Sequence, residues 1–234
     1  MAADSPSPVR AADSSLRAPR VARTLDRLHK SARGDMWRIA RVAPFVVPDF
    51  FGFRKVDDDR LSRRMRETFL PVSRSQGGML YLIARSIDAK RIVEFGTSFG
   101  VSTIYLAAAA KDNGGVVIGS ELEPSKHAKA NEHLREAGLE AYADVRLGDA
   151  MKTLADVEAP IDLVLLDGWK DAYLPILELL KPKLRPKAIV LADNIFTFKK
   201  ALRPYVEYMQ SGKNGFVSST LEISDGFELS VYTG

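Results

Sequence analysis

The sequence contains no cysteine and only 3 histidines among its 234 residues. Without cysteine there are no disulfide bonds, no thiolate metal sites and no thiol nucleophile, a composition that fits a reducing compartment such as the cytoplasm. The histidines do not occur in the H-E-x-x-H spacing of zinc hydrolases, which argues against a zinc site. No apolar run approaches the roughly 18 residues that a membrane helix needs, and the N-terminus lacks the apolar stretch of a secretory signal. We therefore expect a cytoplasmic protein with no membrane partner.

Acidic residues are scarce in the first third of the chain. Residues 1–75 hold 16 Lys and Arg against 9 Asp and Glu, a net charge of +7, whereas residues 76–234 hold 18 against 21, a net charge of −3. A basic region can indicate nucleic-acid binding. Here, however, the basic residues are not interleaved with aromatic side chains that would stack on bases. We expect a solvated helix face and an arginine-rich tail, and no nucleic-acid partner.

Composition divides the chain into three parts. Residues 1–22 are rich in Ala, Ser, Pro and Arg and predict a disordered tail. Residues 23–70 predict N-terminal helices, one over 23–42 and one over 57–69, joined by an apolar connector at 45–53 that we expect to pack against the core. These helices could form a lid, acceptor contacts or oligomer contacts. Residues 71–234 predict a single α/β domain, whose size is sufficient for one sizeable core.

Within that domain, apolar runs and amphipathic segments alternate. Runs of apolar residues without polar alternation predict buried parallel strands, and the helices between them predict βαβ units. A first helix is expected after Ser73, a suitable N-cap. The turn at Ser224-Asp225-Gly226 predicts a final hairpin whose last strand is antiparallel. The five expected βα strands cover 91–96, 116–122, 143–149, 161–167 and 188–193, and the hairpin strands cover 215–223 and 227–233.

Polar residues follow the first three strands, where ligands bind in sheets of this kind. Gly96 and Gly100 precede a helix in a G-x-x-x-G spacing, which allows a close approach of the backbone but is not the pyrophosphate-binding G-x-G-x-x-G. Glu121 ends the second strand, where an acid can accept both hydroxyls of a ribose. Asp149 ends the third strand, where it could cap the next helix or accept from an adenine amino group. These features favour a nucleoside ligand and disfavour a nicotinamide-dependent oxidoreductase.

The fourth and fifth strands both end on aspartate, at Asp167 and Asp193, and Asn194 follows the second of these. The carboxyl ends of parallel strands share one edge of a sheet, so we expect these side chains to lie together. Oxygen ligands of this type suit Mg²⁺. Lys170, three residues after Asp167, would stand beside the cation as a base.

The motifs in their order along the chain resemble the magnesium-dependent O-methyltransferases, which include the catechol and caffeoyl-CoA types. These motifs are E-F-G-T-S-F-G-V-S, the acid after the second strand, G-D-A, D-G-W-K-D-A-Y-L-P, L-A-D-N and D-G-F-E-L-S-V-Y. The resemblance covers roughly residues 70–234. It implies a Rossmann-like class I methyltransferase fold with a doubly wound, seven-stranded, mostly parallel sheet and an antiparallel C-terminal hairpin strand.

The resemblance also implies the roles of individual residues. Mg²⁺, or another hard divalent cation, would be held by Asp167, Asp193 and Asn194, and Lys170 would be the catalytic base. The resemblance also assigns Glu222 to the second hydroxyl of the acceptor. S-adenosylmethionine would be bound by the following residues: Val72, Gly77, Glu94, Gly96, Thr97, Ser102, Glu121, Asp149, Ala150, Asp167 and Trp169.

The function implied is divalent-metal-dependent transfer of a methyl group from S-adenosylmethionine to a hydroxyl of a small, catechol-like aromatic acceptor. An alternative keeps the cofactor without the metal and methylates a different nitrogen or oxygen acceptor. A non-catalytic partner-binding role is disfavoured because every position of the metal site is intact. The family contains homodimers and monomers, so the resemblance leaves both open.

Overall fold

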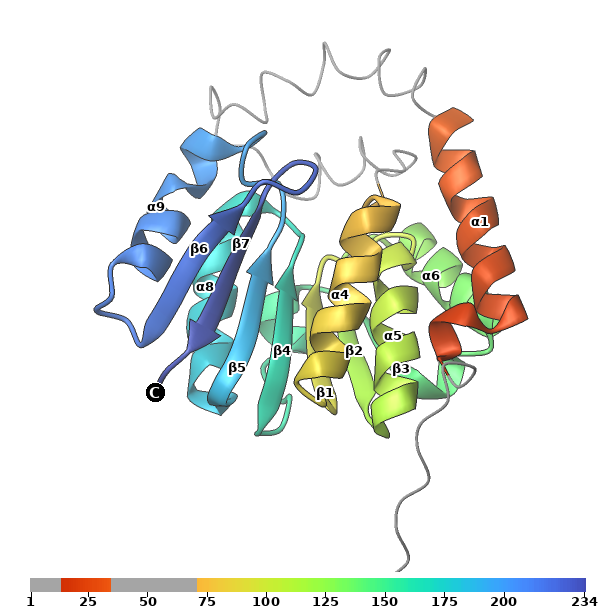
Figure 1. The fold of residues 1–234 in the computed structure, drawn as a ribbon, viewed down its shortest axis with the longest axis horizontal. Helices are drawn as coiled ribbons and strands as arrows, with labels where there is room; N and C mark the ends of the chain where they lie inside the picture. The colour runs from red at the N-terminus through yellow and green to blue at the C-terminus, as the bar shows by residue number, and fades with distance from the viewer. Residues whose placement is uncertain (1–13, 35–70) are drawn as a thin grey trace, which may run out of the picture.

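The computed structural model describes residues 14–34 and 71–234. The expected helix over 57–69 and the apolar connector at 45–53 lie outside the described residues. The described part is an α/β domain in three layers, with α4 and α5 on the viewer's side of the central sheet in Figure 1. No helix within the described ranges is long and apolar enough to cross a membrane.

The seven strands pair in the order β3-β2-β1-β4-β5-β7-β6. Strands β1 to β5 are mutually parallel, and β7 runs antiparallel to both β5 and β6. The expected fold class, including the antiparallel hairpin strand, is confirmed. The strands are β1 (Arg91–Phe95), β2 (Val116–Glu121), β3 (Ala143–Leu147), β4 (Ile161–Leu166), β5 (Leu184–Ala192), β6 (Phe216–Leu221) and β7 (Phe227–Tyr232).

Helices cover both faces of the sheet because the strands present apolar side chains on both sides. Alternate residues of β4 divide between two cores: Leu163 and Leu165 pack with α1, α4, α5 and α6, whereas Val164 and Leu166 pack with α7, α8 and α9. The helices are α1 (Pro19–Gly34), α4 (Arg74–Ser86), α5 (Val101–Asn113), α6 (Pro124–Ala137), α7 (Ala150–Thr153), α8 (Tyr173–Leu180) and α9 (Lys199–Gln210). Short 3-10 turns complete the chain: η2 (Ser15–Arg17), η3 (Glu140–Tyr142), η4 (Lys170–Ala172) and η5 (Lys181–Lys183).

Order begins earlier than the composition indicates. The sequence predicts a disordered tail over residues 1–22, yet α1 starts at Pro19 and η2 precedes it. Val21, Leu25 and Leu28 form an apolar stripe, and each is at most 4% exposed where it packs into the first core. This burial at helical spacing offsets the entropy cost of ordering the segment.

The start of α4 agrees with the sequence. Ser73 caps it through a capping box, in which its hydroxyl accepts from the Gln76 backbone N–H and the Gln76 side chain accepts from the Ser73 N–H. This cap places Gln76 at the edge of the sheet where strands β1 to β5 end. Strands β1 and β4 are parallel neighbours, but β2 and β3 are added on one side of this pair and β5 on the other. Open parallel sheets form a ligand crevice at such a change of strand order.

Candidate active site

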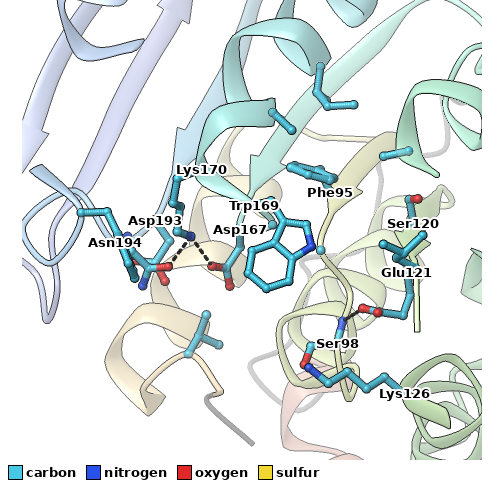
Figure 2. A pocket seen from close by; sticks show the side chains of 18 of the residues that line it. Phe95, Ser98, Ser120, Glu121, Lys126, Asp167, Trp169, Lys170, Asp193 and Asn194 are labelled. Carbon is cyan, nitrogen blue, oxygen red and sulfur yellow. Dashed lines mark hydrogen bonds and ion pairs between the residues drawn. The ribbon is translucent and has the colours of Figure 1, made fainter. Parts of the chain in front are cut away.

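A cavity of about 720 Å³ opens at the carboxyl ends of β1 to β5. Its walls come from the loops after all five strands and from Val72, Gln76 and Asp225. This volume is within the range of small-molecule sites and can hold a nucleoside and a small second ligand. Figure 2 shows acidic side chains at both ends, with Trp169 between Asp167 and Glu121. The cavity therefore has one half formed after β1 to β3 and another formed after β4 and β5.

Glu94, near the end of β1, accepts hydrogen bonds from the loop and helix that follow this strand. Its side chain is 0% exposed and is not part of the cavity wall. One carboxylate oxygen accepts from Ser102 Oγ at 2.6 Å, and the other accepts from Thr97 Oγ1 at 2.9 Å and Thr103 Oγ1 at 2.6 Å. Burial raises the pKa of Glu94, and the hydroxyl donors oppose this. Glu94 thus organises the expected cofactor residues Thr97 and Ser102, while Thr103 is a member of the network that the sequence did not single out.

Gly96 brings the loop after β1 against the loop after β4. It has a φ of +97°, and a Cβ placed on it would lie 2.6 Å from the Gly168 nitrogen and 2.7 Å from the Asp167 carbonyl carbon. Only glycine combines this dihedral angle with so close an approach. The two loops therefore meet backbone to backbone, and Asp167 lies directly beside the half of the cavity formed after β1 to β3.

Glu121 lines the cavity where β2 ends, and it is held by two backbone donors. Its oxygens accept from the Ser98 N–H at 2.6 Å and the Glu123 N–H at 2.8 Å. Lys126, which the sequence did not indicate, also lines this half and lies 5.6 Å from the Phe99 ring centroid. Burial lowers the pKa of Lys126, and Glu121 and Glu123 oppose that shift. The arrangement presents a fixed carboxylate where a ribose diol can bind.

Of the remaining residues expected to bind the cofactor, Val72, Asp149 and Ala150 line the cavity and Gly77 does not. Asp149 caps α7 by accepting from the Met151 N–H at 2.9 Å, and both Asp149 and Ala150 line the cavity. Val72 lines it too. Gly77 is not in the wall; it lies in α4, where a Cβ would come within 2.3 Å of the Tyr105 ring. The structure therefore brings all of these candidates to one region, with Gly77 in a packing position.

Asp167, Asp193 and Asn194 meet in the other half of the cavity, as the strand order predicts. Asp193 accepts from Gln76 Nε2 at 3.0 Å and from the Asn194 N–H at 2.6 Å. Burial raises the pKa of Asp193 to about 8, reinforced by the charge of Asp167, and burial raises the pKa of Asp167 to about 6 against the effect of Lys170. Two buried carboxylates that repel each other are stabilised by a cation between them.

A hard divalent cation fits this donor set, since carboxylate and amide oxygens are its preferred ligands. The set contains two carboxylates and one amide. Across residues 14–34 and 71–234, no group of three or more His, Cys, Asp or Glu side chains is arranged to hold a metal. The candidate site therefore depends on Asn194 as its third protein ligand.

Lys170 stands among the same oxygens. Its Nζ donates to Asn194 Oδ1 at 2.6 Å and lies 3.7 Å from Asp167 Oδ1 (Figure 2). It also donates to Tyr173 Oη at 2.8 Å. Burial lowers the pKa of Lys170, while the neighbouring aspartates oppose this. Tyr173 was not among the expected site residues, although its position three residues after Lys170, at the start of a helix, could have indicated it. A buried lysine with a lowered pKa is suited to accept a proton.

Glu222, which was expected to contact the acceptor, does not reach the cavity. Glu222 is exposed and is not part of its wall, whereas Asp225, in the turn between β6 and β7, lines it. Aromatic side chains enclose the half of the cavity that contains Lys170. The centroid of the Phe198 ring lies 5.3 Å from Lys170 Nζ, and Trp169 is part of the cavity wall. The acidic group at this edge is therefore Asp225.

Comparisons with known proteins find related methyltransferases. Residues 93–195 match a family described as a methyltransferase domain. The chain is 31% identical over 166 residues to a catechol O-methyltransferase of Niastella koreensis, covering 67% of this chain and 73% of that protein. It is 37% identical over 128 residues to a catechol O-methyltransferase of Mycobacterium tuberculosis, covering 54% and 57%. The solved structure of the O-methyltransferase TomG from Streptomyces achromogenes in complex with SAM matches with a TM-score of 0.67 and 29% identity, covering 74% of this chain and 86% of that one.

Proposed function

This chain belongs to the class I O-methyltransferase family and uses S-adenosylmethionine, and we propose that its acceptor is a small aromatic compound with two adjacent hydroxyls, positioned by a divalent cation. The observation that carries the proposal is the convergence of Asp167, Asp193, Asn194 and Lys170 in one half of the cavity. The names of the two catechol O-methyltransferase relatives support the acceptor class.

The half of the cavity after β1 to β3 would hold the methyl donor. The carboxylate of Glu121, fixed by the Ser98 and Glu123 N–H groups, would accept from the ribose hydroxyls. The backbone at Gly96 allows the chain to approach the donor closely, and Trp169 presents an aromatic face near the centre of the cavity, where it suits a sulfonium. The reactive methyl group would then face the half that contains Lys170.

In that half, Asp167, Asp193 and Asn194 would hold the cation. When bound, a divalent cation would fix two adjacent oxygens and lower the pKa of a phenolic hydroxyl. Phe198 and Trp169 would enclose the aromatic ring and exclude water. The acceptor would thereby be held in a single orientation relative to the donor, and such alignment is a large source of rate in group transfer.

Lys170 would act on the acceptor hydroxyl. Burial lowers the pKa of Lys170 and so favours its neutral amine, which would accept the hydroxyl proton. The acceptor oxygen then forms the new O–CH₃ bond with a lone pair, the S–CH₃ bond breaks, and its electron pair remains on sulfur. Hydrogen bonds to Tyr173 and Asn194 hold Nζ in the half of the cavity where the acceptor hydroxyl would lie.

One observation favours the metal-free alternative. Lys170 Nζ already places a cationic group 2.6 Å from Asn194 Oδ1 and 3.7 Å from Asp167 Oδ1. In a metal-independent enzyme this lysine would itself neutralise the carboxylates, and the acceptor would not need two adjacent oxygens.

Methyl transfer from labelled S-adenosylmethionine to catechol, with Mg²⁺ and with EDTA, separates the two. We expect transfer by the wild type to stop in EDTA, and Asp167→Asn to be inactive at any practical Mg²⁺ concentration. Lys170→Met should lower kcat by about 10²–10⁴-fold, the usual contribution of a positioned base. Asp171→Asn is the control, because Asp171 is an exposed carboxylate near the site that does not line the cavity. Transfer that persists in EDTA and in Asp167→Asn would replace the metal-dependent proposal with the alternative.

A further inference from the structure

The amide of Asn194 is held between two charged groups of opposite sign. Its Oδ1 accepts from Lys170 Nζ at 2.6 Å, and its Nδ2 donates to Asp225 Oδ2 at 3.3 Å. An ammonium can only donate and an ionised carboxylate can only accept. Reversing the amide would place donor against donor at Lys170 and acceptor against acceptor at Asp225. Together these neighbours therefore fix Asn194 with its oxygen toward Lys170, whose Nζ also lies 3.7 Å from Asp167 Oδ1.

Asp225 is itself held in place by the loop after β5. Its Oδ1 accepts from the Thr197 N–H at 3.1 Å and from Thr197 Oγ1 at 2.6 Å. Its backbone carbonyl accepts from the Phe196 N–H at 2.9 Å. The turn between β6 and β7 is thus bonded to the loop that carries Asn194, and one oxygen of Asp225 remains directed at the Asn194 amide.

Asn194 lies in the loop after β5, two positions beyond the last residue of that strand. It has a φ of +65°, a left-handed conformation that asparagine adopts more readily than most residues with a side chain. The contacts of its side chain with Lys170 and Asp225 restrain the orientation of the amide.

We infer that Asp225 is a positioning residue: it orients the Asn194 amide so that Oδ1 faces the cation. This inference rests on the proposed function, since it assigns Asp225 to the support of the proposed metal site. It also replaces Glu222 as the functional acid of the β6–β7 region, with a role in orienting a ligand and not in contacting the acceptor.

Asp225→Asn tests this with little change of shape. The new side-chain amide must keep its oxygen on the Thr197 N–H, whose hydrogen is fixed by the backbone. Its NH₂ group then faces Asn194 Nδ2, donor against donor. The hydrogen bond from Nδ2 to residue 225, which helps to hold the Asn194 oxygen toward the metal site, is therefore lost. Loss of such a partner to a metal ligand commonly weakens metal binding by about 10–100-fold.

The measurement is Mn²⁺ binding to the metal-free enzyme, followed by the electron paramagnetic resonance signal of free Mn²⁺. We expect the Kd of Asp225→Asn to rise about 10–100-fold over the wild type, with the Kd for S-adenosylmethionine unchanged. Methyl transfer should recover when Mg²⁺ is raised to saturation, which a general loss of structure would not allow. Asp171→Asn, which removes a nearby exposed carboxylate, should bind Mn²⁺ as the wild type does.

Each result decides a different question. If the wild type binds Mn²⁺ and Asp225→Asn binds it equally well, the role of Asp225 is refuted and the proposed function stands. If the wild type binds no Mn²⁺, the metal site itself fails, and the role of Asp225 fails with it. Should Asp225→Asn not fold, Thr197→Val removes only the hydroxyl donor to Asp225 and should weaken Mn²⁺ binding in the same direction by a smaller factor.

Discussion

Tyr173→Phe isolates the contribution of one hydroxyl to the position of Lys170. The ring is 0% exposed and packs edge-on against Phe95, at 6.3 Å between centroids, and against Tyr205, at 5.6 Å. Phenylalanine keeps these contacts. What is lost is the hydroxyl that accepts from Lys170 Nζ at 2.8 Å and donates to the Asp193 carbonyl at 3.2 Å.

The expected cost follows from these two bonds. A hydrogen bond to a charged group contributes about 1.5–3 kcal/mol and a neutral one about 0.5–1.5 kcal/mol. The free energy of unfolding should therefore fall by about 2–4 kcal/mol, which for a chain of this size lowers Tm by roughly 5–15 °C. Thermal or urea unfolding measures this directly.

Catalysis should change as well, because Lys170 loses one of its two short contacts. We expect kcat to fall about 10-fold through misplacement of Nζ, with the Kd for S-adenosylmethionine unchanged. The hydroxyl stabilises the charged ammonium, so its removal lowers the pKa of Lys170 further. The rising limb of the kcat–pH profile should accordingly move to lower pH.

Tyr208→Phe is the matched control. Tyr208 Oη also bonds to a lysine, Lys181 Nζ at 3.1 Å, but this pair lies outside the cavity and is only partly buried. Its loss should cost less than about 1 kcal/mol and leave the pH profile unchanged. If Tyr173→Phe behaves like this control in stability, kcat and pH profile, Tyr173 does not position Lys170.

Two further predictions concern the framework. Gly96→Ala forces an L side chain to a φ of +97° and places its Cβ 2.7 Å from the Asp167 carbonyl carbon. We expect the free energy of unfolding, measured in urea, to fall by about 2–4 kcal/mol, and S-adenosylmethionine binding, measured by calorimetry, to weaken. Wild-type values for both would contradict the close contact. Burial raises the pKa of Asp162, but donors from the Arg91 N–H and the Arg185 guanidinium outweigh it and hold the pKa below its ordinary value. Its contribution to stability is therefore present above the unfolded carboxyl pKa of about 3.9 and is lost as pH falls through the lower folded value. Unfolding curves of Asp162→Asn should show a smaller loss of stability than the wild type over that acid range, and identical pH dependence would refute the assignment.

Much of the fold could be read from the sequence because its signals are local. Largely apolar runs that lead to Glu121, Asp167 and Asp193 indicated the parallel strands. These three residues line the cavity because strand direction alone determines which edge of the sheet they share. Gly138, at the C-cap of α6 with a φ of +71°, likewise ends its helix for a local reason.

The parts that the sequence did not reveal depend on contacts between distant segments. Asp225 reaches the site only because β7 pairs antiparallel with β5, which returns the β6–β7 turn to the end of β5. Three residues earlier, Glu222 is exposed, and nothing in its local sequence distinguishes it from Asp225. Glu94 is a different case, since its partners are local: it was expected among the cofactor contacts, but the hydroxyls of Thr97, Ser102 and Thr103 donate to it behind the loop.

The backbone contact between Gly96 and the Asp167–Gly168 peptide has a consequence for redesign. With no side chain between the two loops, a shift of one loop displaces the other, and this contact forms the partition between the proposed donor and acceptor halves of the cavity. Attempts to broaden the range of acceptors should leave this partition intact. Phe198, which lines the half of the cavity that contains Lys170, is the position to vary, whereas Thr197 should be kept because it holds Asp225.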